Sequence, residues 1–188
     1  MKIVALVQAR MGSTRLPGKV LRNIVGKPMI GLLLARLSQS NELDEIVVSA
    51  SEEKKNDELQ SVVELLGFKC TRGDERDVLN RFYKSAKFIG ADVVVRITGD
   101  CPLVYPDLVD RCIQGYKSSK VDYFSNIDPA THPDGLDIEV MSFESIKQAN
   151  YEAKSAYDRE HVTPYIRNSD NFSKGYITYL ENLSNQRW

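Results

Sequence analysis

Acidic residues are missing from the first 41 positions of this 188-residue chain, although the chain as a whole is slightly acidic. The same stretch contains seven basic residues: Lys2, Arg10, Arg15, Lys19, Arg22, Lys27 and Arg36. It therefore carries +7, and since the whole chain carries −1, the remainder carries −8. Positive charge confined to one end indicates a small anionic ligand rather than nucleic acid, which needs a broad basic face. A solvated surface that is basic by chance is the alternative.

Long apolar runs and paired cysteines are also missing. No apolar run reaches transmembrane length, so we expect no membrane association. Met1 and Lys2 lead directly into a strand-like segment, and we therefore expect no signal peptide. The number of cysteines is odd and their spacing is not that of a metal site: Cys70, Cys101 and Cys112. This usage predicts a reducing, cytoplasmic setting without a disulfide framework.

Strand and helix patterns alternate along the first two thirds of the chain. The predicted strands are 2–9, 45–49, 68–71 and 93–98, and the predicted helices are 28–38, 57–66, 77–90 and 107–117. Four such units in a row predict an α/β protein, a three-layer α/β/α sandwich around a mostly parallel (mixed), Rossmann-like sheet. Beyond residue 120 we expect short strands at 123–126, 137–141 and 176–180, and helices at 143–153 and 156–168, the latter interrupted near Pro164. No linker interrupts the pattern, which predicts a single domain over residues 1–188.

An anion-binding loop follows the first predicted strand. The segment 8–19, Gln-Ala-Arg-Met-Gly-Ser-Thr-Arg-Leu-Pro-Gly-Lys, combines two glycines, two hydroxyl residues, two arginines and a lysine. Glycines allow backbone N–H groups to approach an anion, and the cations add charge-assisted hydrogen bonds. A polyphosphate is the expected ligand. Five residues separate Gly12 from Gly18, and Val20 follows Lys19, so the segment is not a P-loop; it also lacks a G-x-G-x-x-G fingerprint.

Other candidate groups lie at the same predicted sheet edge or later in the chain. Asp100 ends the strand 93–98 and is either a metal carboxylate or a turn residue. Asp137 and Glu139 share one face of a predicted strand, where they bind a metal or sugar hydroxyls or are simply solvated. Arg159 and His161 lie on different faces of a helix and are read as anion or sugar contacts, as a subunit interface, or as structural residues.

The start of the predicted helix 77–90 carries further charges. Arg76, Asp77 and Arg81 either face the ligand-binding edge of the sheet or serve as ordinary caps and surface charges.

At these residues the sequence resembles cytidylyltransferases of the spore-coat polysaccharide type, relatives of the acylneuraminate and KDO (3-deoxy-manno-octulosonate) cytidylyltransferases. The resemblance covers nearly the whole chain through the following blocks: 8–21, 72–73, 77–79, 96–103, 133–137 and 159–164. It implies a fold of the nucleotide-diphospho-sugar transferase type. It also implies transfer of CMP from CTP to a hydroxyl of a sugar or sugar acid in surface polysaccharide synthesis, with pyrophosphate released and Mg²⁺ (or Mn²⁺) required.

The resemblance also implies roles for individual residues. It assigns catalysis to Arg10, Lys19 and Asp100, with Asp100 as the metal ligand. It assigns nucleotide binding to Gln8, Ala9, Arg10, Met11, Gly12, Ser13, Arg15, Lys19, Thr98 and Gly99. It assigns sugar binding to Asp137, Glu139, Arg159 and His161. Because relatives are commonly dimers, a homodimer is one expectation; neither nucleic acid nor a membrane is expected as a partner.

One departure from the family pattern leaves alternatives open. Relatives usually continue past the positions of Arg187 and Trp188 into a segment of Asp-x-Pro-Glu-Asp character, which supplies a further carboxylate toward the metal. This sequence ends at Trp188, so we expect either a C-terminal truncation or substitution by Asp137 or Glu139. Two other functions are kept as alternatives. One is a sugar transferase that uses a finished nucleotide sugar, with Asp137 and Glu139 as a loose imitation of its metal pair. The other is a nucleotide-binding module inactivated by loss of the tail.

Overall fold

A seven-stranded mixed sheet forms the centre of the molecule, in the order β5-β4-β1-β6-β8-β7-β9. The computed structural model describes residues 1–13 and 15–187, so Thr14 of the predicted anion loop and Trp188 lie outside the described residues. The strands are β1 (Ile3–Ala9), β4 (Glu45–Ser51), β5 (Lys69–Gly73), β6 (Val93–Thr98), β7 (Tyr123–Ser125), β8 (Glu139–Ser142) and β9 (Lys174–Tyr176). Within this sheet β8 pairs antiparallel with both of its neighbours, and the other pairs are parallel.

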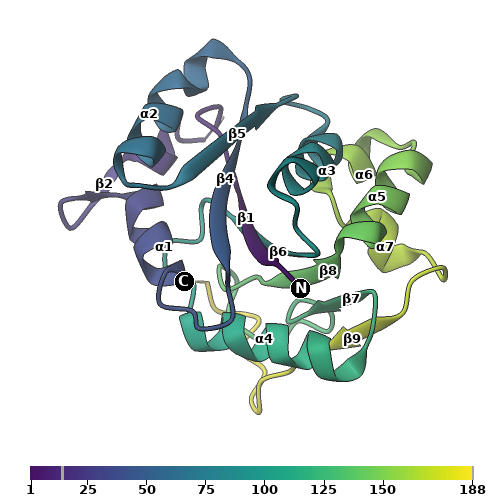
Figure 1. The fold of residues 1–188 in the computed structure, drawn as a ribbon. Coiled ribbons are helices and arrows are strands. Elements are labelled where there is room, and N and C mark those ends of the chain that lie inside the picture. Colours follow the sequence, from purple (N-terminus) through teal and green to yellow (C-terminus); the bar gives the residue numbers. More distant parts are fainter. Residues whose placement is uncertain (14, 188) are drawn as a thin grey trace.

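Helices cover both faces of the sheet (Figure 1). One face is packed by α1 (Met29–Leu37), α2 (Asp57–Leu65) and α4 (Pro106–Ser119). The other is packed by α3 (Val78–Ile89), α5 (Phe143–Glu152) and the segment of α6 (Ala156–His161) and α7 (Pro164–Asn168). Two buried hydrophobic clusters result, because β1 and β6 send alternate residues to opposite faces. The predicted three-layer α/β/α fold is confirmed.

The predicted helix boundaries hold within one or two residues where capping signals are present. Asp77 accepts a hydrogen bond from the amide of Asn80 and begins α3, and Gly90 ends it in the left-handed conformation. Ser142 caps α5 in the same way through Ser145. The predicted helix 156–168 is divided at Val162, a buried β-branched residue with φ of 73°. Such a φ is strongly disfavoured for valine, so the surrounding packing must impose it.

Three features differ from the sequence prediction. Strand β8 begins at Glu139, so Asp137 is not in a strand. The last strand is Lys174–Tyr176 rather than 176–180, because its register is set by parallel pairing with β7. A small hairpin of β2 (Asn23–Ile24) and β3 (Lys27–Pro28), with the 3-10 turns η1 (Lys19–Leu21) and η2 (Lys54–Asn56), was not predicted. None of the helices in the described ranges is both long and apolar enough to cross a bilayer.

Candidate nucleotide site

The anion loop leaves the carboxyl end of β1 and folds back on itself. The carbonyl of Met11 accepts hydrogen bonds from the amides of Ser13 and Gly18, both at 3.0 Å. Gly18 has φ of 68°, which a residue with a side chain rarely adopts, and it leads into η1. The amide of Met11 donates to the side chain of the buried Asn56 at 2.8 Å. Asn56, which sequence reasoning missed, therefore anchors the loop.

A cavity of about 410 Å³ lies between this loop and the end of β6. Its lining combines the loop, the β6 end and one residue of α6: Gln8, Arg10, Gly12, Ser13, Arg15, Lys19, Val20, Thr98, Gly99, Asp100 and His161. Most residues predicted to bind a nucleotide thus meet in one place. Ala9 and Met11 do not line the cavity, because their side chains pack into the core. Parallel strands bring distant loops to one sheet edge, which explains the convergence.

Opposite charges face each other across the cavity. The Lys19 ammonium lies 2.6 Å from Oδ2 of Asp100. Burial works to raise the pKa of Asp100, but the hydrogen bond and charge of Lys19 outweigh it, and the pKa is lowered. Asp100 is therefore ionised at neutral pH. Arg10 and Arg15 add two cations, so the lining carries an excess of positive charge suited to a polyanion.

A second polar cavity of about 670 Å³ adjoins the first and shares Arg10 with it. Arg159 lines this second cavity, and its guanidinium forms a two-point pair with Asp77, at 2.9 and 2.6 Å. Arg76 also lines it. The Arg81 side chain, in contrast, is buried and does not line the cavity, and burial lowers its pKa to about 10. Of the three charged residues at the start of α3, Arg76 and Asp77 therefore line this cavity and Arg81 does not.

The four residues predicted to bind sugar do not converge. His161 lines the first cavity and Arg159 the second. Asp137 lines a third cavity of about 280 Å³ with Asp134 and Arg167. Burial raises the pKa of Asp137, and the neighbouring carboxylates of Asp134 and Glu139 add to the shift.

Glu139 corrects the sequence prediction most clearly. Its side chain is only 1% exposed, and its oxygens are engaged by Arg96 and by the Tyr123 hydroxyl. It therefore faces neither a sugar nor a metal in this structure. The prediction assumed one solvated strand face, whereas β8 lies inside the sheet between β6 and β7 with helices on both sides.

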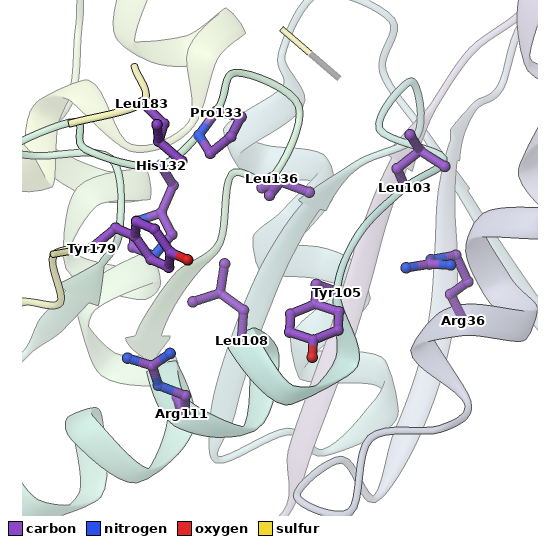
Figure 2. A pocket seen from close by; sticks show the side chains of 10 residues that line it. All are labelled: Arg36, Leu103, Tyr105, Leu108, Arg111, His132, Pro133, Leu136, Tyr179 and Leu183. Atoms are coloured by element: carbon purple, nitrogen blue, oxygen red, sulfur yellow. The ribbon is translucent and has the colours of Figure 1, made fainter. Parts of the chain in front are cut away.

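A fourth cavity, of about 380 Å³, has a different character and was not predicted (Figure 2). The buried Leu108 and Leu136 and the exposed Leu103 and Tyr105 make its lining largely apolar, and Arg36 and Arg111 lie on opposite sides of it. His132 and Tyr179 close one end, with ring centroids 5.6 Å apart. This lining is unsuited to a triphosphate, so the cavity beside Lys19 and Asp100 remains the candidate nucleotide site.

Known proteins resemble this chain over most of its length. A family model described as "Cytidylyltransferase" matches residues 4–186. The chain is 37% identical over 171 residues to the spore coat polysaccharide biosynthesis protein SpsF of Bacillus subtilis, covering 88% of this chain and 70% of the relative. It is 34% identical over 174 residues to a 3-deoxy-manno-octulosonate cytidylyltransferase of Bdellovibrio bacteriovorus, covering 90% and 66%.

Solved structures point in the same direction. The structure of a cytidylyltransferase from Leptospira borgpetersenii superposes with a TM-score of 0.94 at 31% identity, covering 100% of this chain and 80% of the other. The family match spans nearly the whole chain and includes both loops of the cavity. On this agreement of sequence and fold, the chain belongs to the cytidylyltransferase family.

Proposed function

We propose that this chain transfers CMP from CTP to a hydroxyl of a sugar or sugar acid, with release of pyrophosphate, in surface polysaccharide synthesis. The observation that carries the proposal is the cavity in which Lys19 and Asp100 face each other beside Arg10 and Arg15. The name of the 3-deoxy-manno-octulosonate cytidylyltransferase relative supports a sugar acid as acceptor, and that of the spore coat polysaccharide biosynthesis protein SpsF supports the polysaccharide setting.

The residues of the cavity act mainly by positioning and by charge. The loop amides, Arg10 and Arg15 hold the triphosphate so that an acceptor oxygen can attack the α-phosphorus in line. A new O–P bond forms, the bond to the β-phosphate bridge oxygen breaks, and the acceptor proton passes to solvent. Lys19 stabilises the charge that develops on the departing pyrophosphate.

A divalent cation fits the carboxylate of Asp100. Mg²⁺ is commonly held by one or two carboxylates together with substrate phosphates. Asp100 is ionised, its side chain is 42% exposed, and it borders the phosphate cavity. No group of three or more His, Cys, Asp or Glu side chains forms a metal site within the described residues, which agrees with a cation completed by the nucleotide. Bound there, Mg²⁺ or Mn²⁺ would neutralise phosphate charge, and Lys19 would turn from Asp100 to the phosphates.

A transferase that uses a finished nucleotide sugar is less favoured. That reaction normally needs an exposed pair of metal carboxylates, and Glu139 is buried in an ion pair with Arg96. A nucleotide-binding module without turnover is kept as an outcome of the test below.

Pyrophosphate release tests the proposal directly. Wild-type protein is assayed with CTP, Mg²⁺ and a panel of sugars and sugar acids. Lys19→Ala should lower kcat/KM by about 10²–10³-fold, the loss typical of removing one donor to a developing oxyanion. Lys27→Ala is the matched control, because Lys27 belongs to the same basic stretch but is exposed on the β2–β3 hairpin.

Three results would count against the proposal in different ways. Unchanged turnover in Lys19→Ala would remove Lys19 from the site. Pyrophosphate release that requires a nucleotide other than CTP would overturn the substrate. Tight binding of CTP without release of pyrophosphate, whichever acceptor is supplied, would favour the nucleotide-binding module.

A further inference from the structure

A row of polar side chains crosses the sheet beneath the candidate nucleotide site. Gln8 of β1 and Arg96 of β6 lie on neighbouring strands, two residues apart in register, and Arg96 is directly opposite Glu139 of β8. Side chains alternate along strands, so all three lie on the face packed by α3 and α5. Gln8 lines the cavity at one end of the row, and Glu139 is buried at the other.

Arg96 connects the two ends through the two arms of its guanidinium. Nη1 donates to Oε2 of Glu139, and Nη2 donates to Oε1 of Gln8 at 3.3 Å. The second oxygen of Glu139 accepts a hydrogen bond from the Tyr123 hydroxyl at 2.6 Å. The Arg96 side chain is 13% exposed and that of Glu139 1%. Burying such a pair seldom adds stability, because desolvation offsets the attraction.

The contact with Arg96 fixes the orientation of the Gln8 amide. Arginine has only hydrogen-bond donors, so the Gln8 atom that faces it must be the oxygen. The amide nitrogen of Gln8 then points away from Arg96. Among residues 1–13 and 15–187 the one hydrogen bond found for the Gln8 side chain is that of its oxygen with Arg96, and the side chain borders the cavity with Arg10 and Lys19. The row thus presents a free N–H donor where an anion is expected.

We propose that Arg96, anchored by Glu139, is a positioning residue that holds the Gln8 amide so that Nε2 donates to a phosphate oxygen of the nucleotide. The inference rests on the proposed function, since it places the triphosphate in this cavity. Without Arg96, the amide rotates between two orientations, and only one of them presents a donor. Glu139 acts one step further away, by holding the first arm of Arg96.

Binding of CTP with Mg²⁺, measured by calorimetric titration, tests the role without requiring an acceptor. Gln8→Met removes the donor. A triple variant, Arg96→Met with Glu139→Met and Tyr123→Phe, replaces the network by apolar groups, a change that is often neutral for stability. Each should weaken CTP binding about tenfold. Combining them should weaken it no further, because both act through the same amide.

Two single variants keep the test independent of folding of the triple variant. Gln8→Glu has the same shape and still accepts from Arg96, but it turns an oxygen toward the phosphates, so CTP binding should fall more than tenfold at an unchanged melting temperature. Arg96→Lys keeps a charge beside Glu139 but lacks the second arm, and binding should fall about tenfold. Removing the Lys117–Glu42 ion pair by changing both residues to Met is the matched control and should leave CTP affinity unchanged.

The outcomes separate this inference from the proposed function. Wild-type affinity for CTP in folded Arg96→Lys, or losses that multiply when Gln8→Met and the triple variant are combined, would overturn the positioning role. Failure of the wild-type protein to bind CTP would instead overturn the proposed function, on which the role depends.

Discussion

Gly99 has less room for a side chain than Gly12, the other glycine that lines the candidate site. Its amide donates to the carbonyl of Gln8 at 2.8 Å. A Cβ added there would lie 2.8 Å from that same carbonyl oxygen and 2.9 Å from Cβ of Ala9. Backbone atoms cannot move aside as a flexible side chain can. A side chain at position 99 would therefore force the ends of β6 and β1 apart, next to Asp100.

Gly99→Ala should therefore impair both folding and turnover. We expect a loss of about 1–3 kcal/mol in the free energy of unfolding, the usual cost of overpacking. We also expect kcat/KM to fall by about tenfold to a hundredfold, because small displacements of reacting groups are costly. Urea unfolding and pyrophosphate release provide the two measurements.

Gly90→Ala supplies the control for this prediction. Gly90 has φ of 70° and no atom within 4 Å of the added Cβ, and it ends α3 far along the chain from the anion loop. It should cost about 1 kcal/mol of stability through backbone strain alone and leave kcat/KM unchanged. Equal kinetic effects of the two variants would show that the close approach at Gly99 has no bearing on the site.

At the scale of elements, Asp77 links α3 to α6. One oxygen caps α3 by accepting from the amide of Asn80 at 3.1 Å, and both oxygens bind the guanidinium of Arg159. The two functions can be separated, because asparagine retains the cap and loses the charge.

Asp77→Asn should lower the free energy of unfolding by about 0.5–1 kcal/mol, as expected for a partly exposed ion pair. Asp77→Ala should cost about 1 kcal/mol more, the usual value of an N-cap. Urea unfolding midpoints of the three proteins give both differences. If the two variants are equally destabilised, the N-cap has no measurable effect on stability. The whole loss of unfolding free energy then comes from the ion pair with Arg159.

At the scale of the whole molecule, stability should report which nucleotide is bound. A ligand present at one hundred times its dissociation constant stabilises the folded state by about 2.7 kcal/mol. For a chain of this size, that corresponds to a rise in melting temperature of about 5–10 °C. We expect the largest rise with CTP and Mg²⁺ among the four nucleoside triphosphates. Equal rises with all four would mean that the cavity recognises the phosphates alone.

The parts of the fold that could be predicted from the sequence are those with local signals. The strand over Val93–Thr98 and the helix between Asp77 and Gly90 are marked by buried periodicity and by caps within a few residues. The convergence of the loops after β1 and β6 follows from parallel order alone. Local patterns were therefore sufficient for the architecture and for the meeting of these two loops at one cavity.

The parts that could not be predicted depend on pairing between distant segments. Whether Glu139 is solvated is decided by the insertion of β8 between β6 and β7, which its own sequence does not encode. An interruption of the helix 156–168 was expected near Pro164, but the positive φ of Val162 is imposed by packing that local sequence does not encode. Arg96 had a usable signal, since a lone charge within an apolar strand must find a buried partner.

The position of β1 has a consequence for synthesis of the chain on the ribosome. Of the strands of this sheet β1 is synthesised first, yet it lies in the middle of the sheet and pairs with β4 and β6. Its partners, residues 45–51 and 93–98, are synthesised later. At a translation rate of about 5–20 residues per second, the apolar segment Ile3–Val7 therefore stays unpaired for several seconds. During that interval it exposes apolar surface and unpaired backbone, the features that make nascent chains prone to aggregation.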